Sequence, residues 1–414
     1  MAENLIGSEI IKLAGEIRER TLQGEKIYNF TIGDFDPQLF PIPEPFLNAI
    51  IEAYRKNETN YPPADGMAGL RDAISRFTSE TLGLDYPSSD ILVAGGSRPL
   101  IYAIYKALVD EGDTVLFPVP SWNNNHYTHL SAAQMVCIET QPENNFMPSA
   151  ADLAPHIENA TLIALCSPLN PTGTVFTKTD LGQICELVLA ENNRRKGLNK
   201  KPVYLMYDHI YWLLTYGNTI HYNPVSLYPE MAKYTIFVDG MSKGFAATGV
   251  RVGWSFGPKK VIAKMKSILG HIGAWAPKAE QVAAGNFLKN SAAVSEYLTD
   301  FKSQIENSLQ SFYQGFQELK AEGHNVDAIS PQAAIYLTVK IDLIGKTTPD
   351  GSLITTTPQI TSYLLNHGGI ALVPFSAFGA SAESVWYRLS VGTASKEDIS
   401  GFFTNFRKIL SELK

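Results

Sequence analysis

Short runs of β-branched and aromatic residues alternate with longer helix-like segments through the middle of the chain. Such nearly continuous apolar runs are typical of strands that are buried on both faces of a sheet. A helical pattern such as that of residues 177–195 separates them. The alternation predicts an α/β fold, with a mostly parallel central sheet and helices on both faces. The predicted strands span residues 113–120, 135–140, 161–168, 203–208, 234–240 and 252–257.

The pattern changes toward both ends of the chain. Residues 301–323 have a long helical period, and residues 334–342 and 385–392 read as strands, which predicts a smaller α+β domain. The first residues contain one helix and a proline-rich loop at 30–43. We therefore expect three segments. They are an N-terminal arm that also contributes to the small domain (1–50), a large domain (51–300) and a small C-terminal domain (301–414).

Composition narrows the class of protein. The chain has 414 residues and a formal net charge of −7, with Lys and Arg spread along it, which argues against a nucleic-acid surface. The basic run at 192–201 is expected to be a solvated loop. No apolar run approaches the ~20 residues that a membrane span needs, and the N-terminus lacks the basic start of a signal peptide. Cys137, Cys166 and Cys185 show no metal or redox spacing, so we expect buried free thiols and a cytoplasmic protein.

Polar and aromatic residues follow five strand-like runs, four of those given above and a further one at 91–94. Ligands of a parallel sheet collect at the carboxyl ends of its strands, so these residues predict one shared site. In chain order they are Gly96, Ser97 and Arg98 after the run at 91–94, Trp122, Asn170, Asp208 with Tyr211, and Ser242 with Lys243.

Taken singly, each of these signals has an ordinary structural explanation. The glycines and Ser97 before a helical pattern favour an anion, helped by Arg251, but also suit a simple capped turn. Asp208 at a strand end needs a cation such as a protonated ring nitrogen, or it caps a helix. Lys243 among small residues is a candidate nucleophile, although most lone lysines are solvated.

Together the signals point to one cofactor. An indole such as that of Trp122 could stack on a flat ring, or belong to the core. An anionic phosphate, a ring nitrogen, an aromatic face and an aldehyde partner are the features of pyridoxal 5′-phosphate. Competing motifs fail, because Val250 and Arg251 follow the Walker-like glycines, and His126 and His129 lack a third metal ligand. We therefore expect no metal.

The order of the motifs resembles one family over nearly the whole chain. Asn-Pro-Thr-Gly, then Asp, then Ser-Lys and Gly-x-Arg-x-Gly form a specific set. The chain is similar to the class I/II aminotransferases of the fold-type I pyridoxal-phosphate enzymes, the aspartate aminotransferase-like group. The motifs are YPPADGMAGLRDAI, GGSRPLIYAIYKAL, PSWNNNHY, SPLNPTGTVF, YDHIYWLLTYG, SKGFAATGVRVGW and WYRLSVG.

The resemblance implies a role for each candidate residue that would hold the cofactor. Lys243 resembles the Schiff-base lysine that also moves the substrate proton, and Asp208 the partner of the pyridine nitrogen. Tyr211 and Asn170 resemble the groups that bond the phenolic oxygen, and Trp122 the ring that stacks on the cofactor. The phosphate would be held by Gly96, Ser97, the backbone of Arg98, Ser242 and Arg251.

It also implies how substrate and subunits are arranged. Arg388 resembles the arginine that binds the substrate α-carboxylate, with help from Asn170 and the backbone of Gly33. Tyr61 resembles a tyrosine that reaches the phosphate from a partner subunit, which implies a homodimer with shared active sites. Arg98 or Lys278 could bind a second carboxylate.

The expected activity is amino transfer between an L-amino acid and a 2-oxo acid by ping-pong half-reactions, with aspartate and 2-oxoglutarate as the favoured pair. A lyase, decarboxylase or acyltransferase of the same fold is the alternative. A cofactor-binding regulator is disfavoured, because the pattern begins almost at the first residue and leaves no room for a DNA-binding module. Two positions depart from the family, Gly240 where a serine is common and Phe375 where a glycine is common.

Overall fold

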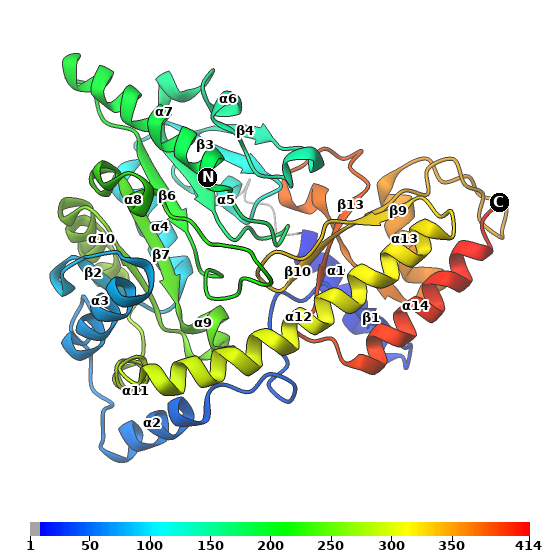
Figure 1. Ribbon diagram of the computed structural model, residues 1–414, viewed down its shortest axis with the longest axis horizontal. Helices are drawn as coiled ribbons and strands as arrows, with labels where there is room; N and C mark the ends of the chain where they lie inside the picture. Colours follow the sequence, from blue (N-terminus) through cyan, green and yellow to red (C-terminus); the bar gives the residue numbers. More distant parts are fainter. Residues whose placement is uncertain (1–8) are drawn as a thin grey trace.

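The computed structural model describes residues 9–414 of the chain. Within them, the large sheet has the strand order β2-β8-β7-β6-β5-β3-β4 (Figure 1). Only β8 is antiparallel to its neighbours in this sheet, so the prediction of a mostly parallel sheet is confirmed. The strands are β2 (Ile91–Ala94), β3 (Thr114–Val119), β4 (Gln134–Glu139), β5 (Ala160–Cys166), β6 (Tyr204–Asp208), β7 (Thr235–Gly240) and β8 (Gly253–Phe256).

Helices cover both faces of this sheet, which explains why its strands are apolar without alternation. On β6, Met206 packs into the core beneath α4 and α10, and Tyr207 packs into the core on the opposite face. The helices of this part are α2 (Glu44–Arg55), α3 (Ala68–Leu82), α4 (Ser97–Leu108), α5 (Asn124–Leu130), α6 (Ala150–Leu153), α7 (Lys178–Gly197), α8 (Pro224–Leu227), α9 (Met241–Gly244), α10 (Lys259–Ile272) and α11 (Lys278–Leu288).

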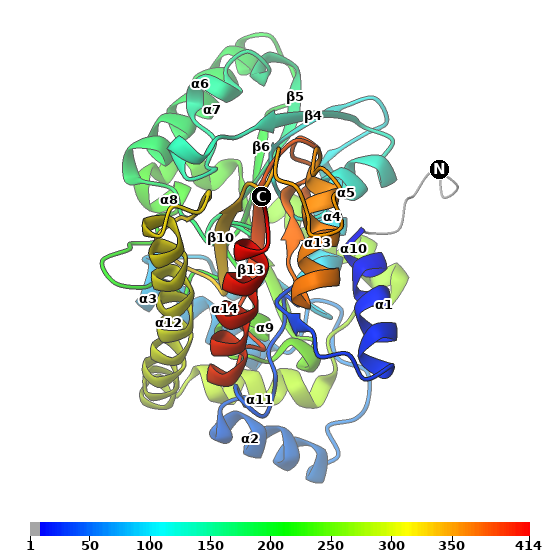
Figure 2. The ribbon, with the colours of Figure 1, turned by 90° about the vertical axis from the view of Figure 1, so that its right-hand side faces the viewer.

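The C-terminal part has a smaller, antiparallel sheet in the order β12-β13-β10-β9, with helices beside it. Helix α14 lies between α12 and α13 (Figure 2). Its elements are α12 (Ser291–Ala321), β9 (Val326–Ala328), β10 (Tyr336–Ile341), α13 (Thr357–Gly368), β11 (Ile370–Ala371), β12 (Val373–Pro374), β13 (Trp386–Ser390) and α14 (Lys396–Ser411).

Helix α12 joins the large and C-terminal parts, and the N-terminal segment packs against the C-terminal part. Helix α12 begins against the core of the large part through Val294 and continues into the C-terminal core from Phe301 onward (Figure 1). Near the N-terminus, β1 (Tyr28–Asn29) pairs with β11, and α1 (Glu9–Leu22) packs Ile17 against Leu365. Residues 1–8 of the expected arm lie outside the described residues, and the domain limits themselves stay a prediction.

Two expectations about surface residues are wrong. Cys137 is exposed rather than buried, because β4 is the edge strand of the sheet and its outer residues are open to solvent. The basic run at 192–201, which reads as a solvated loop, begins inside α7, where buried Arg195 donates from Nε to Glu191 at 2.6 Å.

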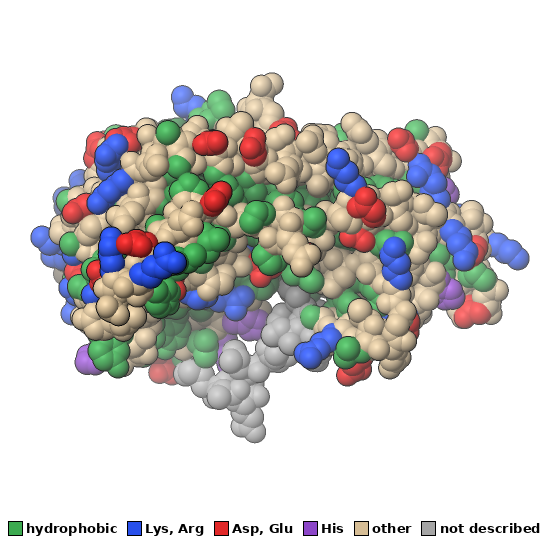
Figure 3. All heavy atoms as spheres, turned by 90° about the horizontal axis from the view of Figure 1, so that it is seen from below, with side chains coloured by type: hydrophobic (Ala, Val, Ile, Leu, Met, Phe, Trp, Pro, Cys, Tyr) green, Lys and Arg blue, Asp and Glu red, His purple; other side chains and the backbone are tan. Residues whose placement is uncertain are grey.

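Lys and Arg side chains are interspersed with Asp and Glu side chains on the face drawn in Figure 3. Among the described residues, no helix is both long enough and apolar enough to cross a membrane.

Candidate active site

A cavity of about 750 Å³ opens at the carboxyl ends of the large sheet's strands, against the C-terminal part. The structure brings most of the sequence-predicted residues to its wall. They are Gly33, Ser97, Arg98, Trp122, Asn170, Asp208, Tyr211, Ser242, Lys243, Arg251 and Arg388. Residues that are more than 350 positions apart in the chain, such as Gly33 and Arg388, therefore line one cavity.

One end of the cavity is suited to an anion. Helix α4 begins after Gly96 without a side-chain cap, so its first N–H groups remain available. Gly96 has φ 94°, and a Cβ there would lie 1.9 Å from Nη2 of Arg251. That guanidinium donates to the carbonyl oxygens of Gly95 (3.1 Å) and Thr248 (2.6 Å). The absence of a side chain at Gly96 is what allows the cation to lie against the helix end.

Asp208, the last residue of β6, places a carboxylate in the cavity. It accepts a hydrogen bond from the backbone N–H of Ile210 at 3.1 Å, and no cation of the described chain forms an ion pair with it. Burial raises the pKa of Asp208 to about 6. A protonated ring nitrogen would supply the missing cation.

Tyr211 follows Asp208 in the same loop and shares a hydrogen bond of 2.7 Å with the hydroxyl of Tyr336. Burial raises the pKa of the Tyr211 hydroxyl well above its usual value, so it remains protonated and able to donate.

Lys243 lies in α9, directly after β7. Its Nζ donates to the carbonyl oxygen of Gly33 at 2.5 Å. Burial is the main cause that lowers the pKa of Lys243 to about 8; Asp34 opposes this shift, and the nearby guanidinium of Arg388 contributes to it. An amine with this pKa is partly neutral near pH 8 and can act as a nucleophile.

Arg388, on β13, is 2 % exposed and lies between the rings of Tyr336 (4.7 Å) and Phe378 (4.9 Å). Nη1 donates to Oδ1 of Asn170 at 3.0 Å, and Nη2 donates to the carbonyl oxygen of Thr31 at 2.6 Å. Its Nε has no hydrogen-bond partner, and no carboxylate of the described residues pairs with it. A buried guanidinium without an anion is suited to bind a carboxylate that enters from outside.

Several cavity residues were missed by sequence reasoning. Asp34 accepts hydrogen bonds from Thr248 Oγ1 (2.6 Å) and from the N–H of Phe35 (2.8 Å), which links the N-terminal loop to the segment after Lys243. Its position directly after Gly33 is the only signal that could have identified it. Tyr336 sits in a strand-like run with no motif, so only the fold identifies it.

Three other positions lie apart from the cavity wall. Tyr61 is 83 % exposed and its ring contacts Trp275 at 5.4 Å. Lys278 pairs with Glu58 at 2.7 Å and donates to Asn60 at 2.6 Å. Phe375, which replaces a common family glycine, is fully buried and packs behind the cavity in the core around Phe146 and Phe378.

Comparisons with known proteins identify the family. The model of aminotransferase class I and II matches residues 25–402. An aspartate aminotransferase of Geobacillus stearothermophilus is 27% identical over 91% of this chain and 90% of that protein. A bifunctional aspartate aminotransferase and glutamate/aspartate-prephenate aminotransferase of Petunia hybrida is 30% identical over 90% of this chain and 75% of that protein.

Solved structures agree. The aspartate aminotransferase of Rhizobium meliloti superposes with a TM-score of 0.91 at 25% identity, covering 100% of this chain and 98% of that one. An aromatic aminotransferase of Pyrococcus horikoshii shares the fold, with a TM-score of 0.83 at 24% identity over 96% of this chain and 99% of that one.

The fold and the cavity are those of an enzyme that uses pyridoxal phosphate. The chain belongs to the class I and II aminotransferase family, and it is a pyridoxal-phosphate-dependent aminotransferase of fold type I. The residues present fit that cofactor, because the cavity offers an N–H-rich helix end with a guanidinium, a carboxylate that pairs with no cation of the described residues and a lysine with a lowered pKa.

Proposed function

We propose that this aminotransferase acts on amino acids that carry a second carboxylate, aspartate or glutamate, with a 2-oxo acid as the partner substrate. The supporting observation is the Arg98 guanidinium, which lies in the cavity 5.3 Å from the centre of the Trp122 ring. No carboxylate of the described residues forms an ion pair with it. Lys243, Arg251 and Arg388 suffice for the cofactor and one α-carboxylate, which leaves Arg98 for a further anion.

The names of the relatives are consistent with this proposal. The similar proteins from Geobacillus stearothermophilus and Rhizobium meliloti are both aspartate aminotransferases. Lys278 was the other candidate for a second carboxylate, but its bonds to Glu58 and Asn60 and its position outside the cavity argue against that role.

The proposed cofactor site uses residues from five strand ends. The α4 N-terminus, Ser242 and Arg251 would bind the phosphate, and Asp208 would keep the ring nitrogen protonated. Tyr211 and Asn170 would donate to the phenolic oxygen, and the Trp122 indole would cover the ring. When bound, pyridoxal phosphate supplies the electron sink that makes the Cα–H bond of an amino acid acidic.

The remaining steps belong to this chain's own side chains. Arg388 would bind the α-carboxylate through its guanidinium and, with Asn170, fix the direction in which the Cα–H bond points. Lys243 Nζ would then accept the proton from Cα and return it, because a pKa of about 8 allows both transfers near neutral pH. The rings of Tyr336 and Phe378 hold the guanidinium in place and keep water from its two faces.

We propose in addition that two chains form a homodimer with shared active sites. The support is the position of Tyr61, whose ring is 83 % exposed and does not line the cavity of its own chain. In a dimer, the Tyr61 side chain of one chain would reach the phosphate bound in the cavity of the other chain. A cytoplasmic location stays a prediction.

Substitution of Arg98 tests the substrate class. We expect Arg98→Met to lower kcat/KM for aspartate about 100-fold, as for the loss of a charge-assisted contact, and to leave that for alanine nearly unchanged. Lys278→Met is the matched control and should change neither. Equal losses for aspartate and alanine, or a wild-type enzyme that prefers alanine, would refute a dicarboxylic substrate.

A further inference from the structure

A buried carboxylate lies behind the cavity, near the end of β7. Asp239 is 2 % exposed and shares a face of the sheet with Phe237, outside the cavity wall. Its Oδ1 accepts a hydrogen bond of 2.7 Å from the N–H of Gly240, and its Oδ2 accepts one of 2.9 Å from Nε1 of Trp212. Buried carboxylates are costly and need such partners, so this one calls for an explanation.

The first partner belongs to the segment that carries Lys243. Gly240 directly precedes α9, and the N–H of Met241 donates to the carbonyl oxygen of Val252 at 3.0 Å. A Cβ on Gly240 would lie 2.8 Å from that carbonyl oxygen, so the backbone passes close to β8 at this point. The bond from Gly240 to Asp239 therefore fixes the beginning of the turn that aims Lys243 into the cavity.

The second partner belongs to the loop after β6, whose side chains point in two directions. Asp208 and Tyr211 line the cavity, and His209 and Trp212 pack behind it. A backbone bond of 2.8 Å from the N–H of Trp212 to the carbonyl oxygen of His209 holds the turn. His209 Nε2 lies 3.9 Å from Oδ2 of Asp239, beyond hydrogen-bond distance.

We propose that Asp239 is a positioning residue that holds the loop of Asp208 and Tyr211 in register with the turn of Lys243. One carboxylate oxygen holds each segment, so a single rigid group sets their separation from behind the sheet. This inference rests on the roles proposed above for Asp208 and Lys243.

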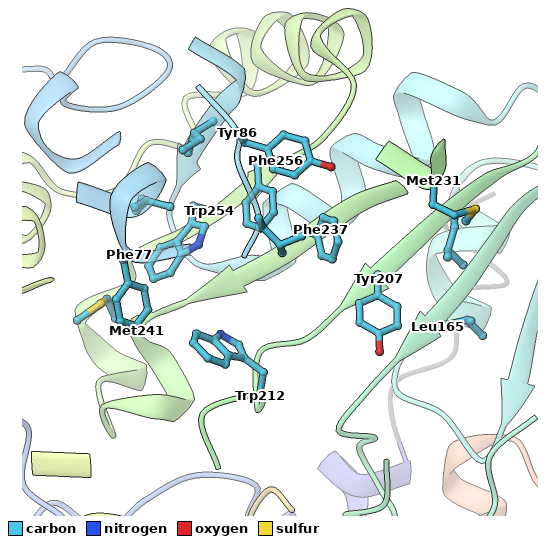
Figure 4. Close-up of a cluster of buried hydrophobic side chains, with 14 of the residues drawn as sticks. Phe77, Tyr86, Leu165, Tyr207, Trp212, Met231, Phe237, Met241, Trp254 and Phe256 are labelled. Carbon is cyan, nitrogen blue, oxygen red and sulfur yellow. The ribbon is translucent and has the colours of Figure 1, made fainter. Parts of the chain in front are cut away.

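The chain offers a matched pair of tryptophans for the test. Trp212 and Trp254 both belong to the apolar cluster of Figure 4 and are at most 8 % exposed. Trp212 Nε1 donates to Asp239, but Trp254 Nε1 has no hydrogen-bond partner in the described chain. Replacement by phenylalanine removes a similar volume at either site and breaks the bond to Asp239 only at Trp212.

Three quantities separate positioning from a purely structural role. We expect Trp212→Phe to raise the Kd for pyridoxal phosphate and to lower kcat, each about tenfold, as for the loss of one buried bond to a carboxylate. KM for the amino acid should hold, because Arg388 has no contact with Asp239. Trp254→Phe should leave Kd and kcat unchanged, and the Tm of the cofactor-free protein measures any loss of stability in each variant.

A double-mutant cycle isolates the bond itself. Trp212→Phe and Asp239→Ala should each raise the cofactor Kd by some factor. The double variant should raise it by less than the product of these two factors, because both substitutions remove the same contact. Identical cofactor Kd and kcat in Trp212→Phe and Trp254→Phe, or a change in Tm alone, would overturn the inference. Lys243→Ala and Asp208→Asn test the proposed roles of Lys243 and Asp208 separately from the role of Asp239. If these two bind and react as the wild type does, the proposed roles fail, whatever Trp212→Phe does.

Discussion

Replacement of Asp208 by asparagine should stabilise the cofactor-free protein while it weakens the enzyme. The Asp208 carboxylate is half-buried at the end of β6 and pairs with no cation of the described residues, and its removal from water raises its pKa from 3.8 to about 6. Asparagine keeps an oxygen that can accept the bond from the N–H of Ile210, so the main change is the loss of the charge. The substitution therefore isolates the cost of a charge that the proposed function requires.

The size and direction of the effect follow from proton linkage. Between pH 3.8 and about 6 the native state holds a proton at Asp208 that the unfolded chain has released, so native stability falls as the pH rises through this window. Each unit of pKa difference is worth about 1.4 kcal/mol, which gives a cost of at most about 3 kcal/mol above pH 6. Asp208→Asn should therefore increase the free energy of unfolding by most of this amount at pH 7.5 and by little at pH 4.

Urea unfolding of the cofactor-free wild type and Asp208→Asn at both pH values measures the difference. Asp300→Asn, at an exposed position of α12, controls for the loss of one negative charge. With pyridoxal phosphate added, the order should reverse, because the wild type gains a partner for its carboxylate and the variant does not. An Asp208→Asn protein that is less stable than the wild type at pH 7.5, or equally shifted at both pH values, would contradict this reasoning.

Two further predictions concern the other charges of the cavity. Arg388→Gln should raise KM for the amino acid between about 10- and 100-fold, since one charge-assisted contact is lost, with the Kd for pyridoxal phosphate unchanged; equal effects on both constants would argue against a carboxylate-binding role. In the cofactor-free protein, the rate at which Lys243 reacts with an amine-specific reagent should rise with pH, with a midpoint near pH 8. Mass spectrometry of the Lys243 peptide measures this rate. Asp34→Asn should lower that midpoint, because Asp34 raises the pKa of Lys243, and an unchanged or higher midpoint would show that Asp34 does not act on it.

Much of the fold could be predicted because the physics is local. Each expected strand of the large sheet overlaps an observed one, since strands buried on both faces, as all but the edge strand β4 are, have to be apolar along their whole length. The exposure of Cys137 could not be predicted, because the position of β4 at the edge depends on strand order. The buried end of α7 was missed because a buried arginine such as Arg195 looks like a solvated one until Glu191 is placed beside it.

Some cavity residues could be identified from the sequence and others could not, for similar reasons. Asp208, Lys243 and Arg388 were found because their residue types, in that order, match a family pattern, and the sheet brings strand ends together. Tyr336 was missed because its role depends on a contact between β10 and the loop after β6, two segments that are distant in sequence. Lys278 was a candidate by charge alone, and its ion pair with Glu58 became visible only in the fold.

Three charged side chains of the cavity have no oppositely charged partner within the described chain. Among the described residues, Asp208 pairs with no cation, Arg388 pairs with no carboxylate, and half-buried Lys243 has a carbonyl oxygen as its one hydrogen-bond partner. Removing these charges from water, fully at Arg388 and partly at Asp208 and Lys243, costs stability, and a bound cofactor or amino acid would provide the opposite charge or covalent partner. Binding energy at this site therefore comes in part from relieving that cost, so cofactor and substrate should each stabilise the protein by more than their contact area alone predicts. Burial raises the pKa of Asp239 to about 8, so this group is also costly, but both of its oxygens have hydrogen-bond partners, as expected for a group that organises the site without taking part in the chemistry.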